Sequence, residues 1–346
     1  MITSYNLSQS SEWDELVSSF ANYDVYYLSG YVRAFALHGD GEPLLLYYHS
    51  DDVRAINVVM KRDISEDKRF TDKIASGEYY DLSTPYGYGG WIFEGNPGKS
   101  FEDEYDIWCS DNNVVSEVVR FHPVLNNAQY AGNDIYERVL LGPTIAIKLD
   151  NEEDVWNRFS SKNRGHIRVA IKEGVTVKID DSEEDFDIFK RIYKETMNHD
   201  EATDYYYFDD AFFESIRNDL KDKCKIFTAY LGDVAIASAI MIYASEYMNY
   251  HLSGQVFEYR RFSGTSMILY EASKWGIEHN SKWLHLGGGL GAKEGPLYDF
   301  KKSFYKKGED KSFYLGKRIV DEEKYKYLLS LRDNVESSGF FPAYRA

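Results

Sequence analysis

The sequence of 346 residues predicts a mixed α/β protein built around a mixed sheet. Segments rich in β-branched and aromatic residues alternate with segments whose apolar residues repeat every three or four positions, and these are the patterns of strands and helices. Several strand-like segments follow one another directly in the second half, which favours antiparallel pairs within the sheet. The length also suits two domains of ordinary size.

The first half of the chain contains four strand-like segments and one helix-like segment. β-branched and aromatic side chains between polar or turn residues predict strands at 43–49, 55–61, 114–121 and 142–149. The segment EDEYDIWCSDN at 102–112 predicts a helix. The stretch YYDLSTPYGYGGWIF at 79–93 places Pro85 and three glycines among aromatic residues, and we interpret it as a wall of a binding cleft.

The second half opens with a helical pattern over 152–174, in which Ile167, Ala170 and Ile171 share one stripe and Gly174 is the expected C-terminal cap. Further strands are expected at 175–179, 224–232, 234–244, 247–254, 282–287 and 311–320, and helices at 183–199, 209–220 and 264–280. A last patterned segment spans 322–334. We place the domain boundary near Asp150, giving domains 1–150 and 151–346 without a Pro/Gly/Ser linker.

Composition excludes several classes of protein. A hydrophobic content of 43% argues against disorder. No apolar run reaches the roughly 18 to 20 residues of a membrane span, and the first residues lack the pattern of a signal peptide, so we expect a cytoplasmic location. Cys109 and Cys224 fit neither a disulfide framework nor a metal cluster, so no metal is expected. The sequence also lacks a P-loop, a dinucleotide fingerprint and a nucleophile elbow.

The charge is uneven along the chain. A net charge of −17 repels nucleic acid on average and argues against duplex DNA as a partner. From 256 to 318, however, twelve Lys and Arg stand against seven Asp and Glu. A second basic run, SKNRGHIRVAIK, carries Lys162, Arg164, Arg168 and Lys172 with no acid before Glu173. Local basic surface on an acidic body suits a phosphate-bearing ligand, although solvated helix faces give the same pattern.

Two stretches of the second half can carry chemistry. In YRRFSGTSMILYEA, Arg260 and Arg261 precede a turn that opens a helix at Gly264, which resembles the pyrophosphate loop of acyl-CoA-dependent acyltransferases. An ordinary capped helix explains this pattern equally well. In LHLGGGLGAKEGPLYDFKKSF, three glycines precede a segment that carries Lys301 and Lys302. A lysine beside a reacting carbonyl can stabilise an oxyanion by roughly 3 to 4 kcal/mol, whereas an exposed lysine would have no such role.

Several motifs together resemble the FemABX-type transferases, two-domain GNAT-like enzymes of peptidoglycan bridge formation, and their acyltransferase relatives. In the second half these motifs are YHLSGQ at 250–255, WLHLGGG at 283–289 and LYDFKKSF at 297–304. TPYGYGG at 84–90 and RFHPVL at 120–125 resemble stretches of the family's first domain. The segments at 160–175 and 205–216 resemble further parts of its second domain, so that the likeness covers most of the chain in order.

The resemblance implies two GNAT-like domains that share a cleft, with an acceptor amine in the cleft and an acyl donor along the second domain. The coiled-coil arm of some members is missing, because no long stretch shows sustained heptads. The catalytic residues implied are Lys301 and Phe300, with Lys301 meeting the developing negative charge. We further expect Arg260, Arg261, Gly264 and Lys302 to bind the donor. For the acceptor we expect Tyr86, Tyr88, Arg120, His122, Tyr207, Tyr250 and His251.

The expected function is amide-forming transfer of an acyl or aminoacyl group to a primary amine, on a cell-wall or surface-glycan precursor. Acyl-CoA and aminoacyl-tRNA are the two candidate co-substrates, with no bound cofactor, and a tRNA would make contact through its acceptor end. One alternative is an acetyl-CoA-dependent N-acetyltransferase of a small molecule or sugar amine. Another is a non-catalytic GNAT-like binding protein. The general base stays open between Asp299 and a carboxylate or phosphate of the substrate.

Overall fold

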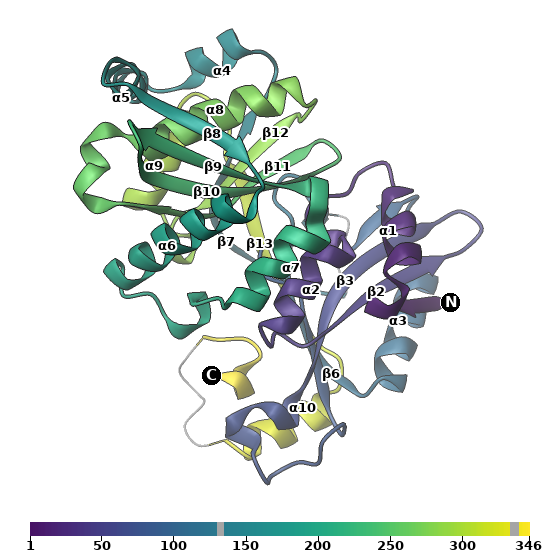
Figure 1. The fold of residues 1–346 in the computed structure, drawn as a ribbon. Coiled ribbons are helices and arrows are strands. Elements are labelled where there is room, and N and C mark those ends of the chain that lie inside the picture. The colour runs from purple at the N-terminus through teal and green to yellow at the C-terminus, as the bar shows by residue number, and fades with distance from the viewer. Residues whose placement is uncertain (130–134, 333–338) are drawn as a thin grey trace. The chain divides into compact units, whose positions relative to one another are not determined.

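The computed structural model describes residues 1–129, 135–332 and 339–346. The chain divides into two compact units, and each is described by itself. Unit 1 contains Met1–Leu141 and Ser312–Ala346, and unit 2 contains Gly142–Lys311. Strands and helices alternate in both units and the sheets mix parallel and antiparallel pairs, so the predicted mixed α/β class is confirmed (Figure 1).

Unit 1 is a sheet with helices packed on it. Its strand order is β1 (Ile2–Tyr5), β2 (Glu42–His49), β3 (Arg54–Asp63), β4 (Tyr80–Ser83), β6 (Val114–Arg120) and β13 (Lys311–Ile319), with β5 (Ile92–Glu94) paired to β3. β4 and β6 are parallel, and the other pairs named are antiparallel. Its helices are α1 (Ser10–Ser18), α2 (Ser29–Leu37), α3 (Lys99–Asp111) and α10 (Glu322–Ser330).

The strands of unit 2 position the candidate site. Its strand order is β7 (Glu137–Lys148), β12 (Trp283–Gly288), β11 (Tyr247–Gln255), β10 (Val234–Ala244), β9 (Cys224–Leu231) and β8 (Val175–Asp180). Only β11 and β12 are parallel among these neighbours. Its helices are α4 (Glu152–Arg158), α5 (Ser161–Lys172), α6 (Glu183–His199), α7 (Asp210–Leu220), α8 (Gly264–Glu278) and α9 (Pro296–Lys302).

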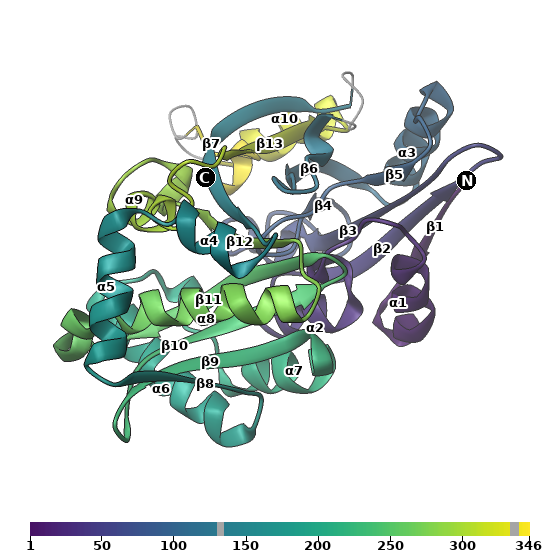
Figure 2. The same cartoon turned by 90° about the horizontal axis from the view of Figure 1, so that it is seen from above.

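Helices cover both faces of the unit 2 sheet. α8 and α5 share one apolar core with every second residue of β10, namely Ala237, Ala239 and Met241. α6 packs on β10 and β11 from the opposite face (Figures 1 and 2). Since α8 begins directly after the segment Phe257–Phe262, this packing also fixes the turn that carries Arg260 and Arg261.

Some elements differ from the sequence prediction. The helix predicted over 152–174 is two helices, because Phe159 is extended (ψ 144°) and the Ser160 side chain caps α5 by accepting from the Asn163 amide. Ile171, which the periodicity placed on the buried stripe, is 53% exposed, whereas Ile167 and Ala170 are buried. The predicted segment 322–334 is α10 in part, and its residues 333 and 334 lie outside the described residues.

The compact units also differ from the predicted domains 1–150 and 151–346. Residues 312–346 belong to unit 1, because β13 pairs with β6 along Leu315–Ile319. The longest described helix, α6, has 17 residues, so no described segment forms a long coiled-coil arm. Within the described ranges, no helix has the length and apolar character needed to cross a membrane.

Candidate active site

The unit 2 sheet opens between β11 and β12. The two strands pair in parallel over only three positions, from Tyr247 opposite Trp283 to Asn249 opposite His285. β11 continues to Gln255 and β12 to Gly288, and no pairing between them is described beyond those three positions. Backbone donors and acceptors along the splayed part of β11 therefore face a gap in the ladder, where an extended ligand can bind them.

β11 carries a β-bulge at this opening. Ile240 of β10 pairs with Leu252 and Met241 pairs with Tyr250, so His251 is the extra residue. A bulge bends the strand and redirects the neighbouring backbone groups. His251 is only partly exposed, and desolvation lowers the pKa of its imidazole to about 3, which makes it neutral at pH 7. Burial raises the pKa of the Tyr250 hydroxyl to about 12, so it keeps its proton.

Lys301 of α9 reaches the end of β12. Its Nζ donates a hydrogen bond of 2.7 Å to the carbonyl oxygen of Gly288. Desolvation lowers the pKa of the Lys301 ammonium to about 8. An ammonium carries three donors and this contact uses one of them, so the others can meet an incoming oxyanion.

In the turn before α9, other parts of the backbone come so close that only glycine fits. Gly287 has φ 74°, in the region that favours glycine, and lies where the pairing of β12 with β7 shifts register. A Cβ on Gly289 would lie 2.0 Å from the carbonyl oxygen of Lys293, and one on Gly142 would lie 1.8 Å from that of Ala292. The turn between β12 and α9 is therefore packed tightly on itself and on β7, which fixes where α9 begins.

Phe300 lies on α9 and Phe304 lies two residues after its end, and the two rings have different surroundings. Their rings meet edge to face with centroids 5.3 Å apart. Phe304 is fully buried and packs against Phe159, whereas Phe300 is partly exposed on the same core. Phe304 therefore anchors the end of α9, and part of the Phe300 ring stays exposed.

Lys302 points away from Gly288. Its Nζ donates to the carbonyl oxygen of Gly308 at 2.8 Å and to Asp310 Oδ1 at 2.5 Å. The hydroxyl of Tyr298 donates to the other oxygen of the same carboxylate at 2.7 Å. Lys302 and Tyr298 thus connect α9 to the turn before β13, and the contacts of Lys302 are structural. Its predicted role in donor binding stays a prediction.

The start of α8 offers an anion site. Arg260 and Arg261 are exposed on the segment Phe257–Phe262, and neither forms an ion pair with a described residue. Ser263 is left-handed (φ 58°), no side chain caps α8, and its first turn contains no acid. A Cβ on Gly264 would come within 3.1 Å of Ile236 and Ala237, so the helix starts directly on β10. Free N–H groups beside two arginines suit a phosphate.

Three of the predicted acceptor residues gather in unit 1. The amide of Gly89 donates to the carbonyl oxygen of Arg120 at 2.8 Å, which joins TPYGYGG to the end of β6. Tyr86 stacks on Phe35 at 5.6 Å, and Tyr88 contacts Phe313 edge to face at 5.2 Å. Burial raises the pKa of Tyr88, and the Arg120 guanidinium acts in the opposite direction. Arg120 is exposed, so it is the charged group of this set that a ligand can reach.

His122 lies beside this set but inside the protein. Its Nδ1 accepts from the amides of Val124 and Leu125 at 3.2 and 3.1 Å, so the proton is on Nε2. Nε2–H then donates to Asp24 Oδ2 at 2.8 Å, and both side chains have no exposed surface. This placement favours a structural role for His122 over direct contact with an acceptor.

Tyr207 lines a hollow of about 360 Å³ in unit 2. The wall combines aromatic rings with two lysines and two aspartates, and its lining residues are Lys190, Tyr193, Lys194, Met197, Tyr206, Tyr207, Phe208, Asp209, Asp210 and Phe213. Tyr207 is 39% exposed. The aromatic run DYYYFDD predicts part of this wall from the sequence. The lysines come from α6, and no local sequence pattern indicates that they lie beside the aromatic run.

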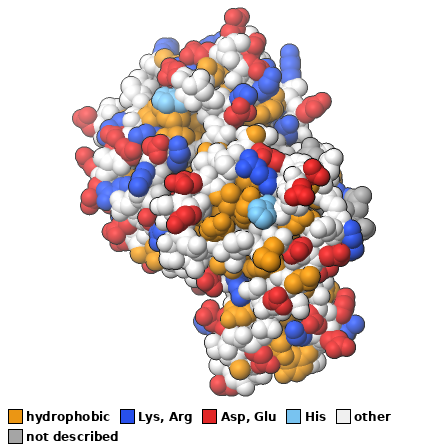
Figure 3. All heavy atoms as spheres, turned by 90° about the vertical axis from the view of Figure 1, so that its right-hand side faces the viewer, with side chains coloured by type: hydrophobic (Ala, Val, Ile, Leu, Met, Phe, Trp, Pro, Cys, Tyr) orange, Lys and Arg blue, Asp and Glu red, His pale blue; other side chains and the backbone are white. Residues whose placement is uncertain are grey.

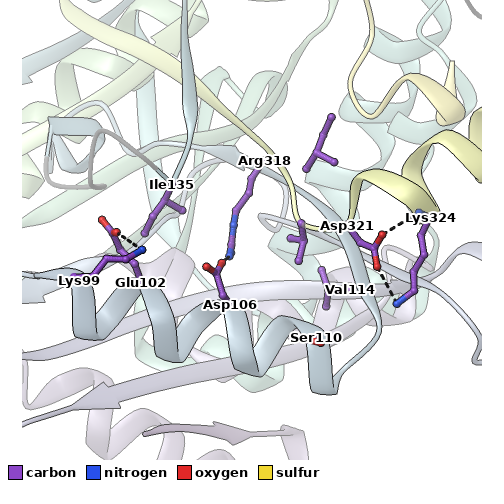
Figure 4. A pocket seen from close by; sticks show the side chains of 11 residues that line it. Lys99, Glu102, Asp106, Ser110, Val114, Ile135, Arg318, Asp321 and Lys324 are labelled. Atoms are coloured by element: carbon purple, nitrogen blue, oxygen red, sulfur yellow. Dashed lines mark hydrogen bonds and ion pairs between the residues drawn. The ribbon is translucent and has the colours of Figure 1, made fainter.

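A larger hollow of about 510 Å³ in unit 1 is lined by ion pairs (Figure 4). Arg318 contacts Asp106 and lies 3.6 Å from Glu117, Lys99 pairs with Glu102, and Lys324 pairs with Asp321. Each cation in the lining is thus paired with a carboxylate. In the described ranges, no cluster of three His, Cys, Asp or Glu side chains is placed to hold a metal ion.

Comparisons with known proteins agree with this geometry. The family model described as an acetyltransferase (GNAT) domain matches residues 158–302, which lie in unit 2. A crystal structure of FemX superposes with a TM-score of 0.65 at 14% identity, over 94% of this chain and 99% of FemX. A search of curated protein sequences finds no significant match.

Two further solved structures share the fold. One is a conserved protein of unknown function from Bacteroides thetaiotaomicron, with a TM-score of 0.58 at 12% identity, covering 92% of this chain and 100% of that one. The other is the C-terminal domain of a putative lysylphosphatidylglycerol synthetase from Agrobacterium fabrum, with a TM-score of 0.55 at 11% identity, covering 94% and 96%. The chain therefore has a FemX-like fold with a GNAT domain in its second unit, as the motifs predicted, and this is an acyltransferase fold.

Proposed function

We propose that this protein forms amides by transferring an acyl or aminoacyl group from an activated donor to a primary amine. The observation that carries the proposal is the position of Lys301, whose Nζ bonds the Gly288 carbonyl 2.7 Å away at the end of the strand that splays from β11. A donor whose carbonyl enters this opening would lie between the redirected backbone at the His251 bulge and the Lys301 ammonium.

The reaction follows from these groups. The acceptor nitrogen attacks the carbonyl carbon, a C–N bond forms, and the carbonyl oxygen becomes an oxyanion that Lys301 stabilises by a charge-assisted hydrogen bond. Collapse breaks the C–S bond of a thioester or the C–O bond of an ester, and the leaving sulfur or oxygen takes up a proton and departs as the thiol or alcohol. The nitrogen loses a proton to a base, for which Asp299 and an anionic group of the substrate are the candidates.

The donor is proposed to carry phosphate. Arg260, Arg261 and the uncapped N-terminus of α8 are the proposed site for its pyrophosphate or nucleic-acid phosphate, which their positive charge and free N–H groups support. Acyl-CoA and aminoacyl-tRNA both present such a group. The acetyl-CoA-dependent alternative is favoured by the turn at Gly264, because its close packing on Ile236 and Ala237 lets the free N–H groups approach a compact pyrophosphate.

The acceptor is proposed to be a primary amine on a cell-wall or surface-glycan precursor. Two sets of residues are candidates for binding it, and they are tested separately. In unit 1 these are Arg120 with Tyr86 and Tyr88, where an exposed guanidinium lies beside aromatic rings. In unit 2 the candidate is the hollow at Tyr207, whose aromatic rings suit a ligand with an apolar face. Lys190 in its wall is already paired with Asp187 and Asp210.

The deciding experiment is isothermal titration with acetyl-CoA and, separately, with a stable aminoacylated acceptor-stem mimic at one salt concentration. Binding of the CoA compound alone supports acyl-CoA transfer, and binding of the RNA mimic alone supports aminoacyl transfer. Single-turnover assays with the ligand that binds then compare wild type with Lys301→Ala, and with Lys306→Ala as a matched exposed-lysine control. A non-catalytic binding protein would bind ligand without turnover in every variant.

A further inference from the structure

Asp310 lies in the turn between α9 and β13, and its carboxylate accepts two hydrogen bonds from α9. The Tyr298 hydroxyl donates to Oδ2 at 2.7 Å, and Lys302 Nζ donates to Oδ1 at 2.5 Å. Tyr298 and Lys302 are four residues apart, so they lie one turn apart on the same side of the helix. A single carboxylate therefore binds two successive turns of α9.

The position of α9 depends on such contacts, because the helix is short. It has seven residues and no side-chain cap at its N-terminus. Isolated helices of fewer than roughly 12 residues are marginal in water. Tyr298 is buried, and the buried Phe304 follows the helix. The Ser160 amide donates to the carbonyl oxygen of Ser303 at 2.7 Å, which fixes the C-terminal end. Asp310 adds a polar anchor to these contacts.

Lys301 lies between the two residues that Asp310 holds. Its Nζ donates to the carbonyl oxygen of Gly288 at 2.7 Å, and α9 packs against β12, the strand that ends there. Successive helical residues point about 100° apart. The side of α9 that Asp310 holds is therefore not the side that faces Gly288. A rotation of α9 about its axis would carry the Lys301 Nζ away from Gly288.

Ion pairs are common on this protein, but the pair of Lys302 and Asp310 differs from an ordinary surface pair. Figure 3 shows acidic and basic side chains interspersed over the face that it presents. Exposed pairs of this kind contribute roughly 0.2 to 1 kcal/mol. The side chains of Lys302 and Asp310 are only 25% and 29% exposed. The carboxylate also binds the buried Tyr298, and the ammonium also donates to the carbonyl oxygen of Gly308 at 2.8 Å. These four groups form one network that fixes a geometry.

We propose that Asp310 is a positioning residue for the transfer reaction. Through its two bonds to α9, Asp310 holds the Lys301 ammonium beside the Gly288 carbonyl. The inference rests on the proposed function, in which Lys301 stabilises the oxyanion. Asp310 touches no reacting atom, and the helix transmits its effect. A displacement of about 1 Å in a catalytic contact can lower a rate by up to about 100-fold.

The titration of Lys301 reports its position without any substrate. Burial lowers the pKa of its ammonium from 10.5 to about 8. If Asp310→Ala acted only by removing a negative charge, the ammonium would be less favoured and its pKa would fall further. If α9 loosens instead, the ammonium gains water and its pKa rises toward 10.5. The two effects have opposite signs, so the direction of the shift distinguishes them.

The test follows the titration by NMR of protein with isotope-labelled lysine, and the variant Lys301→Arg assigns the signal. For wild type we expect a midpoint near pH 8. Asp310→Ala should raise it by about one pH unit or more. Tyr298→Phe removes one bond without changing the charge at pH 7 and should raise the midpoint by less. Asp181→Ala is the control, because Asp181 also pairs with a lysine of unit 2, Lys225 at 2.7 Å, and should leave the midpoint unchanged.

Single-turnover kinetics give the catalytic readout. Asp310→Ala should lower the transfer rate by about tenfold or more. The Kd of the donor should stay nearly unchanged, because the proposed phosphate site is at the start of α8. Asp310→Asn should be intermediate, since its side-chain oxygen can still accept one of the two bonds. Circular dichroism and thermal melting establish that each variant is folded under the conditions of measurement.

The outcomes separate this inference from the proposed function. The positioning role is overturned if the Lys301 midpoint in Asp310→Ala falls or stays unchanged, or if Asp181→Ala raises it equally. A transfer rate that drops in Lys301→Ala but not in Asp310→Ala overturns it as well. A raised midpoint in a protein that transfers no acyl group would contradict the proposed function, while supporting the hold of Asp310 on α9.

Discussion

The ammonium of Lys301 donates its hydrogen bond to the carbonyl oxygen of Gly288, thirteen residues earlier in the chain, at 2.7 Å. The contact ties α9 to the end of β12, at the point where β12 has left β11. It also holds a cation in a poorly solvated position, which lowers the pKa of Lys301 to about 8. Most of the testable consequences of the proposed function follow from this pair.

Removing the Lys301 ammonium should slow transfer much more than it weakens donor binding. We expect Lys301→Ala to lower kcat by about 100-fold or more, as for loss of one well-placed oxyanion donor. The Kd of the donor should change only several-fold, since the proposed site for its phosphates is at the start of α8. Rapid-quench kinetics and titration calorimetry measure the two quantities, and Lys306→Ala is the control. A variant within a few-fold of wild-type kcat would contradict the assigned role.

The rate should depend on pH through the same group. The ammonium is the active form, so stabilisation of the oxyanion is complete well below pH 8 and is lost as the pH rises through the folded pKa of about 8. Lys301→Arg keeps its charge at all these pH values. We therefore expect an alkaline fall in single-turnover rate for wild type, and no such fall for the arginine variant, even if its maximum is lower. An identical alkaline limb in both proteins would assign the titration to another group.

The buried ammonium should also cost stability. Its folded pKa of about 8 lies below the ordinary value of 10.5, so folding disfavours the charged form. The cost is fully present below pH 8 and fades as the pH approaches 10.5. Lys301→Met should therefore raise the free energy of unfolding at pH 7 by about 1 to 3 kcal/mol. Denaturant unfolding at pH 7 and pH 10 measures it. The gain should shrink at the higher pH, and Lys306→Met should show neither effect.

Much of the fold could be predicted from local pattern. The strands at 224–254 and the helix at 264–280 appear as β9 to β11 and α8, because their apolar periods and turns are strong over short distances. The break between α4 and α5 could not be predicted in this way, since the capping role of Ser160 depends on the extended conformation of Phe159. The return of residues 312–346 to unit 1 could not be predicted either, because the pairing of β13 with β6 joins segments about two hundred residues apart.

The candidate site could be predicted only in part. The sequence places Lys301 and Lys302 side by side with the same chemistry. Successive helical residues point about 100° apart, so the two lysines diverge, and the packing of the turns around α9 brings Lys301 to Gly288 and Lys302 to Asp310. The bulge at His251 could not be predicted from the sequence either, because it is a shift of register between two strands and the residue pattern of each strand is regular.

Two glycines should respond in opposite directions to the same change. A Cβ on Gly289 would lie 2.0 Å from the Lys293 carbonyl oxygen, so Gly289→Ala must displace the turn before α9. We expect a loss of about 2 kcal/mol and a lower kcat. Gly165 lies inside α5, and a Cβ there would meet no atom within 4 Å apart from its chain neighbours and the nearby backbone of the helix itself, so Gly165→Ala should stabilise by about 0.5 to 1 kcal/mol. Thermal melts of both variants measure the contrast, and equal signs would contradict it.

The buried pair of His122 and Asp24 should matter for folding of unit 1 and not for binding of the acceptor. The imidazole donates from Nε2 to Asp24 Oδ2 at 2.8 Å, and neither side chain is exposed. His122→Ala leaves a buried carboxylate without this donor and should cost about 2 to 3 kcal/mol. Arg120→Ala changes an exposed cation and should leave the melting temperature within a degree or two of wild type. If Arg120 binds the acceptor, its variant raises KM, whereas His122→Ala leaves KM unchanged at temperatures where it is folded. A raised KM for both, with no loss of stability in the histidine variant, would place His122 in the binding site after all.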